Sequence, residues 1–203
     1  MIIKCYRCIK KIRRSIIRPL MSFYIRSLGA EINGKIIING FPYIRIYSGA
    51  NIIIDRGVVL SSGIDANVVG GDERLKILVR GILNIGEGTG ISNSTIVCME
   101  KISIGKRVFI GGGTKIYDTD FHPIHYLDRI ENPNNIKTAP ILIDDDVFIG
   151  AHTIILKGTK IGKGSVIGAG SVVAKDIPAG QVWAGNPVRY IKDIEQADLA
   201  SIN

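Results

Sequence analysis

The stretch IGAHTIILKGTKIGKGSVIGAGSVVAKDIPAG, residues 149–180, places an aliphatic residue at every sixth position. Continued upstream by one step, the series comprises Ile143, Ile149, Ile155, Ile161, Ile167 and Val173. Glycine directly follows three of them, at Gly150, Gly162 and Gly168. A period of six fits neither an α-helix nor isolated hairpins, so it predicts short strands, each ending in a turn, that wind around a common axis.

The same period recurs upstream, and every aliphatic residue that carries it is interpreted as a core position. These residues are Ile104, Ile110 and Ile116; Ile85, Ile91 and Val97; and, more faintly, Ile46, Ile52, Val58 and Ile64. Glycine and small polar residues are expected at the corners, where positive φ or close backbone approach excludes a Cβ. Stability should therefore accumulate coil by coil along the stack.

Composition agrees with one repetitive β domain. The chain has 203 residues, 46% of them hydrophobic, with 24 glycines and only 6% aromatics. Three scattered cysteines, Cys5, Cys8 and Cys98, cannot form a disulfide framework, which favours a reducing, cytoplasmic setting. No stretch approaches the ~20 apolar residues of a spanning helix, and no cleavable leader is evident.

Residues 1–30 form a separate basic segment with eight Lys and Arg and no acidic residue, which leaves 18 basic and 18 acidic residues elsewhere. Its apolar and basic residues recur on opposite faces of a predicted amphipathic helix, which Pro19 should end or kink. The apolar set is Ile2, Cys5, Ile9, Ile12 and Ile16; the basic set is Lys4, Arg7, Lys11, Arg14 and Arg18.

Two interpretations of this basic segment stay open: residues 1–20 contact an anionic membrane surface, or the helix covers the open end of the β stack. One short basic segment without a recognisable nucleic-acid-binding motif does not favour nucleic-acid binding.

The six-residue period has a single long interruption, YDTDFHPIHYLDRIENPNNIKTAPIL, residues 117–142. A repeat stack accommodates an insertion only as a loop that projects from its surface, and a long loop in a compact body is usually functional. Two of the three histidines, His122 and His125, lie in it.

The runs at 149–180 and VWAGNPVRYIKDI at 182–194 resemble the C-terminal half of the hexapeptide-repeat O-acetyltransferases, which include maltose, galactoside and O-antigen or capsular polysaccharide acetyltransferases. The resemblance covers residues 80–194 well and 30–80 loosely. It implies an all-β fold, a left-handed parallel β-helix, and homotrimers that bind acetyl-CoA in clefts between subunits. The implied organisation is a helical segment at 1–30, an acyltransferase β-helix at 31–182 with the active-site loop at 117–142, and a cofactor-proximal segment and tail at 183–203.

The resemblance also implies catalytic residues. His122, in YDTDFHP, matches the position of the family's catalytic histidine and is expected to act as general base. Asp118 and Asp120 could orient its imidazole or could form the turn through bonds to the backbone. Asn93, in GISNSTIV, resembles an asparagine that lines the acceptor site; the alternative is a corner residue of the stack.

For acetyl-CoA, the resemblance points to Gly150 and Ala169 along the pantetheine and to Lys175 and Arg189 at the phosphates, with Lys192 as a weaker candidate. Trp183, the only tryptophan, is expected either against the cofactor or as a plug over the last coil.

No metal is expected, although γ-class carbonic anhydrases share this fold and bind zinc through three histidines. The spacing of His122, His125 and His152 does not match that ligand set, and His152 is expected to face outward. The function expected first is direct acetyl transfer from acetyl-CoA to a sugar hydroxyl of a glycan precursor. The alternatives are N-acetylation of a nucleotide-linked amino sugar, and a non-catalytic or zinc-dependent β-helix protein.

Overall fold

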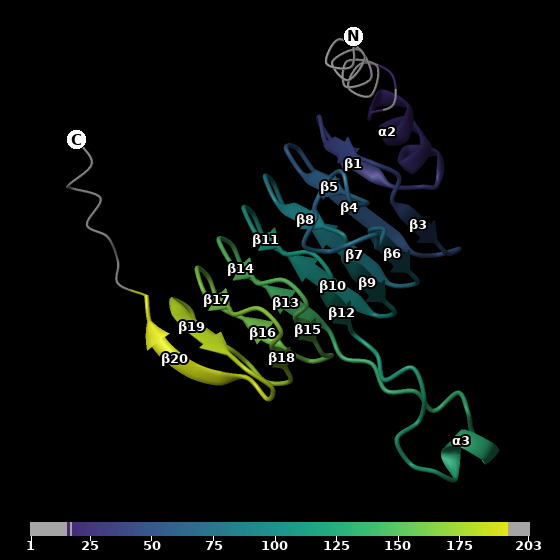
Figure 1. Ribbon diagram of the computed structural model, residues 1–203. Helices are drawn as coiled ribbons and strands as arrows, with labels where there is room; N and C mark the ends of the chain where they lie inside the picture. Colours follow the sequence, from purple (N-terminus) through teal and green to yellow (C-terminus); the bar gives the residue numbers. More distant parts are fainter. Residues whose placement is uncertain (1–15, 17, 195–203) are drawn as a thin grey trace.

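The computed structural model describes residue 16 and residues 18–194. It shows a three-sided stack of parallel coils that runs from α2 (Arg18–Ser27) to a C-terminal hairpin (Figure 1). The successive strands of each coil belong to three different sheets, which we call sheets A, B and C. The fold is therefore a left-handed parallel β-helix, as expected.

The strands of each sheet follow the order of the coils. Sheet A contains β1 (Glu31–Asn33), β4 (Asn51–Asp55), β7 (Ile82–Ile85), β10 (Lys101–Ile104), β13 (Ile141–Ile143) and β16 (Lys160–Ile161). Sheet B contains β2 (Ile37–Asn39), β5 (Val59–Ser61), β8 (Gly90–Ser92), β11 (Phe109–Ile110), β14 (Phe148–Ile149), β17 (Val166–Ile167), β19 (Gln181–Ala184) and β20 (Arg189–Asp193). Sheet C contains β3 (Tyr43–Ile46), β6 (Lys76–Val79), β9 (Thr95–Cys98), β12 (Lys115–Tyr117), β15 (Ile154–Ile155) and β18 (Val172–Val173).

The six-residue series fills the interior. Parallel register stacks Ile104 on Ile143 and Ile143 on Ile161 in sheet A, with the same arrangement in the other two sheets. All six residues of the series from Ile143 to Val173 are fully buried, so this prediction is confirmed. Aliphatic side chains from three directions thus form one continuous core along the axis.

Two of the predicted core positions are wrong. Val97 faces outward and is only half-buried, because β9 is long enough to alternate and places Ile96 and Cys98 inward instead. Ile64 is 51% exposed, because the chain leaves the coil after β5 and returns only at β6.

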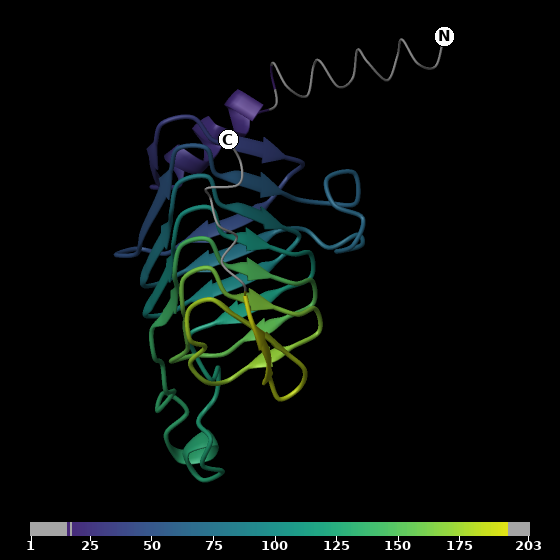
Figure 2. The same cartoon turned by 90° about the vertical axis from the view of Figure 1, so that its left-hand side faces the viewer.

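The stack carries two projecting loops rather than the single interruption predicted. Loop 62–75 connects sheet B to sheet C, and loop 118–140, with the short α3 (Asp128–Glu131), connects sheet C to sheet A. The two loops project from different edges of the stack and flank sheet C (Figure 2).

Helix α2 covers the first coil. Ile25 is fully buried in the core, and Met21 and Leu28 pack against it. Pro19 lies in the first turn, where a helix has no backbone N–H bond to lose. This packing supports the covering role for residues 18–27. The described residues do not include Ile2, Cys5, Ile9 and Ile12 of the apolar set, or most of the predicted amphipathic helix. Of the proposed membrane contact, residues 1–20, they include only residues 16 and 18–20. No helix within the described part is long and apolar enough to cross a membrane.

Candidate active site

Asp118 closes the base of loop 118–140. Its Oδ1 accepts the N–H of Met99 at 2.7 Å, and its Oδ2 accepts those of Glu100 at 2.7 Å and Lys101 at 2.9 Å. Its carbonyl oxygen accepts the N–H of Ala139 from the returning end of the loop, at 3.0 Å. The side chain is fully buried and bonds the backbone of another coil, so Asp118 binds backbone as the alternative expected, but it links two coils and does not form a local turn.

His122 lies just beyond a tight turn at the start of this loop. Phe121 has a φ of 63°, donates its N–H to Thr119 Oγ1 at 3.2 Å, and packs edge-on against Tyr117 with ring centroids 5.2 Å apart. Burial and the carboxylate of Glu73 raise the pKa of Tyr117. The His122 side chain is exposed, which leaves its imidazole accessible to a substrate or to another subunit.

Asp120 has different surroundings from Asp118. Its Oδ1 lies 3.3 Å from Lys157 Nζ, and its N–H donates to the carbonyl oxygen of Lys137 at 3.1 Å. Its Oδ2 is buried and has no hydrogen-bond partner among the described residues. Neither aspartate bonds to His122 in the described chain, but Asp120 has an oxygen that remains to be satisfied.

Asn93 holds loop 62–75 in place. It adopts a φ of 42° and is fully buried. Its Oδ1 accepts the N–H of Gly63 at 2.9 Å, and its Nδ2 donates to the carbonyl oxygens of Asn67 at 2.9 Å and Gly71 at 3.3 Å. The amide is thus engaged at both ends, which supports the corner interpretation over direct donation to an acceptor.

His152 is exposed, as expected, and adopts a φ of 59°. Its Nε2 lies 3.2 Å from the carbonyl oxygen of Val69, so that nitrogen is the donor in this contact. Asn93 and His152, which lie two coils apart at the edge between sheets B and C, therefore both fix the same loop.

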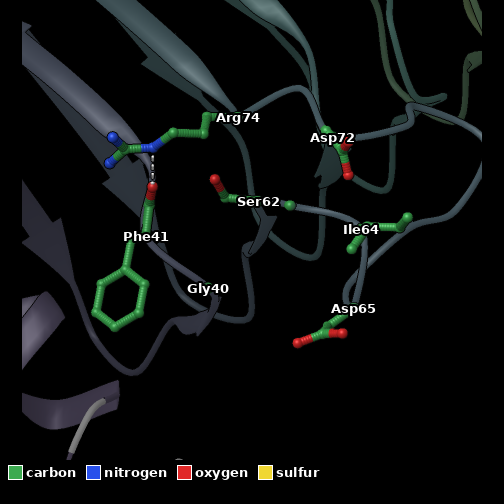
Figure 3. Close-up of a pocket in the computed structure, with 8 residues that line it drawn as sticks. Gly40, Phe41, Ser62, Ile64, Asp65, Asp72 and Arg74 are labelled. Atoms are coloured by element: carbon green, nitrogen blue, oxygen red, sulfur yellow. Dashed lines mark hydrogen bonds between the residues drawn. The ribbon is translucent and has the colours of Figure 1, made fainter.

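Loop 62–75 and the turn before β3 line an open pocket of about 670 Å³ (Figure 3). It is lined by Gly40, Phe41, Ser62, Gly63, Ile64, Asp65, Asp72 and Arg74. The sequence interpretation missed this pocket, because Ile64 happens to continue the six-residue series. The polar run DANVVGGDER at 65–74, which carries no such series, was the signal that could have revealed it.

Gly150 serves the stacking of the coils. Its N–H donates to the carbonyl oxygen of Ile167 at 2.8 Å, and its own carbonyl oxygen accepts a hydrogen bond from Thr153 Oγ1 at 2.8 Å. A Cβ at this position would lie 2.5 Å from Ala169 N, so only glycine allows the next coil to approach this closely. Ala169 is exposed at the same corner, one coil further on.

Trp183 lies close to Lys175, one of the other predicted cofactor residues. Its ring is partly buried against the core, lies 5.3 Å from Lys175 Nζ, and meets Tyr190 edge-on at 6.0 Å between centroids. Its Nε1 donates to Gln181 Oε1 at 2.9 Å. Arg189 pairs with Ala184 across the antiparallel hairpin of β19 and β20. Lys175 and Arg189 are exposed near the last coils, and Lys192 is exposed on the same hairpin.

Residue 16 and residues 18–194, which include all three histidines, contain no group of three His, Cys, Asp or Glu side chains arranged to hold a metal ion. Cys98 is buried, and burial together with the carboxylate of Asp118 raises the pKa of its thiol to about 12. This thiol is therefore a poor nucleophile.

Comparison with known proteins connects this geometry to one class. Residues 140–175 match the family described as bacterial transferase hexapeptide (six repeats). Galactoside O-acetyltransferase of Escherichia coli (strain K12) is 41% identical over 106 residues, which are 52% of this chain and 51% of that protein. A tetrahydropyridine-dicarboxylate N-acetyltransferase of Staphylococcus aureus (strain JH9) is 34% identical over 92 residues, 45% of this chain and 33% of that one.

Among solved structures, a hexapeptide-repeat acetyltransferase of Vibrio cholerae O1 biovar eltor, complexed with acetyl coenzyme A, is 34% identical. The match has a TM-score of 0.52 and covers 56% of this chain and 61% of that one. The chain thus spans about half the length, or less, of the curated relatives it matches. The fold and the matched repeats define a left-handed β-helix of hexapeptide repeats. The resemblance to the hexapeptide-repeat acetyltransferases is confirmed.

Proposed function

We propose that this chain is an acetyl-CoA-dependent O-acetyltransferase that acts on a sugar hydroxyl, with His122 as the general base. The observation that carries the proposal is the position of His122, which an aromatic turn presents at the head of a projecting loop with a fixed base. The similarity to galactoside O-acetyltransferase and to a relative complexed with acetyl coenzyme A supports the chemistry.

In the proposed reaction, the imidazole of His122 takes the proton from the acceptor hydroxyl while the oxygen attacks the thioester carbonyl. The C–O bond forms, the tetrahedral intermediate collapses, and the C–S bond breaks to release the coenzyme A thiolate, which takes the proton from the His122 imidazolium. Asp120 is proposed to orient the imidazole through its unsatisfied Oδ2. Direct transfer is proposed, since Cys98, the one cysteine among residues 18–194, is buried with a raised thiol pKa and is unsuited to carry an acyl group.

The acetyl-CoA site is proposed to run from the corner between sheets B and C, where Gly150 and Ala169 lie, over the last coil to Arg189 and to Lys175 in the turn between sheets C and A. Lys175 and Arg189 are exposed cations that suit phosphate groups. The N–H of Gly150 is already bonded within the stack, so donors to the pantetheine would come from exposed corner residues such as Ala169. The predicted cofactor-proximal segment and tail comprise residues 183–203. Of these, residues 183–194 are described by the structure and are proposed to border the acetyl-CoA site.

The test is release of free thiol from acetyl-CoA with a panel of sugar acceptors, comparing wild type with His122→Ala. We expect turnover to fall roughly 10²- to 10⁴-fold. His125→Ala is the matched control, because it removes another exposed histidine of the same loop and should keep wild-type turnover. Undiminished turnover in His122→Ala would refute the assigned base.

A second candidate is N-acetylation of an amino sugar attached to a nucleotide. The similarity to the Staphylococcus aureus N-acetyltransferase supports acetylation of a nitrogen, although the acceptor in that protein's name is not a sugar. Mild hydroxylamine distinguishes the two, because it cleaves an O-acetyl ester and leaves an acetamide intact. A non-catalytic or zinc-dependent protein would show no thiol release, and metal analysis of the purified chain would separate these last two.

We further propose that the protein works in the cytoplasm as a homotrimer, with residues 1–20 in contact with the inner membrane face. The eight Lys and Arg in residues 1–30 support the last point. Co-sedimentation with anionic vesicles should be lost when residues 1–20 are deleted. Continued sedimentation of that deletion variant would count against membrane contact.

A further inference from the structure

The N-terminal end of the stack combines a cationic pocket with an exposed apolar face of α2. We propose that this end docks on an anionic phospholipid membrane and that the pocket receives the phosphate group of one lipid headgroup. This surface extends the proposed membrane contact of residues 1–20 into the folded body and is independent of the acetyl-transfer reaction.

The pocket lies between α2 and the turn that joins β1 to β2. Its volume is about 680 Å³, and its described lining includes three cations, Arg18, Arg26 and Lys35, and no Asp or Glu. None of the three forms an ion pair with a carboxylate of the described residues. Such a lining attracts an anion, and phosphate suits the paired N–H donors of a guanidinium.

The fold holds two of these cations in place. Arg18 Nη2 donates to Oδ1 of Asn39 at 2.5 Å, and Arg26 Nη2 donates to the carbonyl oxygen of Ile32 at 3.0 Å. Both acceptors are neutral, so each guanidinium keeps its full charge and further N–H groups for a ligand. Lys35 adds its charge from the turn after β1.

The face of α2 turned away from the core is apolar. Leu20, Phe23 and Tyr24 expose 60%, 71% and 46% of their surfaces, whereas Ile25 is fully buried against the first coil. The helical period gathers the three exposed side chains on one stripe. An apolar stripe bordered by cations is typical of helices that lie between lipid headgroups and acyl chains.

Charge and apolarity together select the partner. Residues 1–30 contain eight Lys and Arg and no acidic residue, so the same end of a second copy would be repelled. A nucleic acid would satisfy the cations but leave the apolar stripe in water. An anionic membrane satisfies both.

Docking through α2 fixes how the stack stands on the membrane. Figures 1 and 2 place α3 and the C-terminal hairpin toward the end away from α2. Six strand spacings separate β2 from β19 in sheet B, roughly 30 Å at ~4.8 Å each. Trp183, on β19, therefore stays in the aqueous phase.

Co-sedimentation of the full chain with vesicles of phosphatidylglycerol and phosphatidylcholine tests the surface. Arg26→Gln combined with Lys35→Gln should weaken binding ~25-fold, at about fivefold for each charge. Phe23→Ser should weaken it about tenfold, because the ring no longer enters the lipid boundary. Residues 1–15 are the same in every chain, so their contribution cancels in the comparison.

Matched controls remove the same groups elsewhere. Lys101→Gln combined with Lys160→Gln takes two exposed charges from sheet A, and Phe109→Ser takes an exposed ring from sheet B. Both should change binding less than about twofold. Equal weakening in the controls would overturn the surface. Wild-type binding by the site variants would also overturn it and leave the contact of residues 1–20 standing. Thiol release from acetyl-CoA in solution reports the proposed reaction separately.

Two further measurements identify the ligand and the orientation. Displacement by sn-glycerol 3-phosphate or a short DNA duplex, with no effect of Phe23→Ser, would assign a soluble phosphate or a nucleic acid and overturn membrane docking. Brominated lipids should quench the added emission of Phe23→Trp and spare the wild-type emission, which comes from Trp183, the only tryptophan. Unquenched Phe23→Trp would overturn docking, and quenched wild type would overturn the end-on orientation.

Discussion

Asp118 and Asp120 are two residues apart, yet their carboxylates have opposite surroundings. Three backbone N–H groups saturate the first, whereas the second keeps one oxygen buried and without a partner in the described chain. A buried acceptor without a partner is uncommon in folded proteins, and this one lies two residues before His122. The two residues should therefore respond differently to the same substitution.

Asp118→Asn should destabilise the protein, because an amide NH₂ would face backbone donors that now bind a carboxylate oxygen. We expect a loss of about 1–3 kcal/mol in unfolding free energy, measured by denaturant titration. Asp120→Asn should leave stability within ~1 kcal/mol, since its ion pair with Lys157 is partly exposed, but should lower kcat. Lys157→Gln is the control that removes only that ion pair. Equal stability in the Asp118 variant and the wild type would contradict the structural role.

Asn93→Gly should release loop 62–75, since glycine keeps the positive φ but removes every side-chain bond. We expect faster hydrogen exchange at amides of residues 62–75 and little change in the coils below, measured by mass spectrometry. Asn93→Asp, which retains the acceptor for Gly63 N–H and loses the donor to Asn67, should give an intermediate rate. Unchanged protection in Asn93→Gly would mean that other contacts hold the loop.

Subunit complementation tests whether His122 and the proposed acetyl-CoA residues act across an interface. Chains with His122→Ala and chains with Lys175→Glu and Arg189→Glu, each expected to be strongly impaired alone, would be co-expressed with different tags and co-purified. If sites form between chains in a cyclic oligomer, about one quarter of the sites in a random mixture combine two intact halves. Turnover should recover toward that fraction. Recovery no greater than the sum of the separate variants would place both groups in one chain's site.

Cys98 should resist alkylation in the folded protein. Its thiol is buried, donates to the carbonyl oxygen of Ile82 at 3.2 Å, and has its pKa raised from 9.0 to about 12. A Cys5→Ser, Cys8→Ser background isolates it, and iodoacetamide labelling near pH 8 should require denaturant. Because the folded pKa lies above the unfolded one, the neutral thiol favours folding below about pH 9, and this contribution is lost as the pH rises toward 12. Rapid labelling without denaturant would contradict the burial.

The six-residue period predicted the coils because each inward position must hold an aliphatic residue, whatever the rest of the chain does. Where strands are longer, as at β9, two positions alternate inward, and the period alone selected Val97 in place of its neighbours. Ile64 continued the series by coincidence and concealed loop 62–75. His122 was indicated by its motif, and its role as base stays a prediction.

The roles of the polar residues could not be derived from sequence. Asp118 bonds residues 17 to 19 positions away, and Asn93 bonds residues 22 to 30 positions away. Which donor meets which acceptor depends on how the coils are aligned, and a single residue's neighbours in sequence do not specify that alignment.

At the last coil the chain reverses, and β20 runs antiparallel against β19 with all five of its residues exposed. A parallel stack that simply stopped would leave a row of unsatisfied amides and carbonyls able to template a second molecule end to end. The reversal replaces the parallel end of sheet B with an antiparallel strand, whereas sheets A and C end at β16 and β18. Opening the hairpin should therefore expose β19 as the last strand of sheet B and favour end-to-end association of the protein.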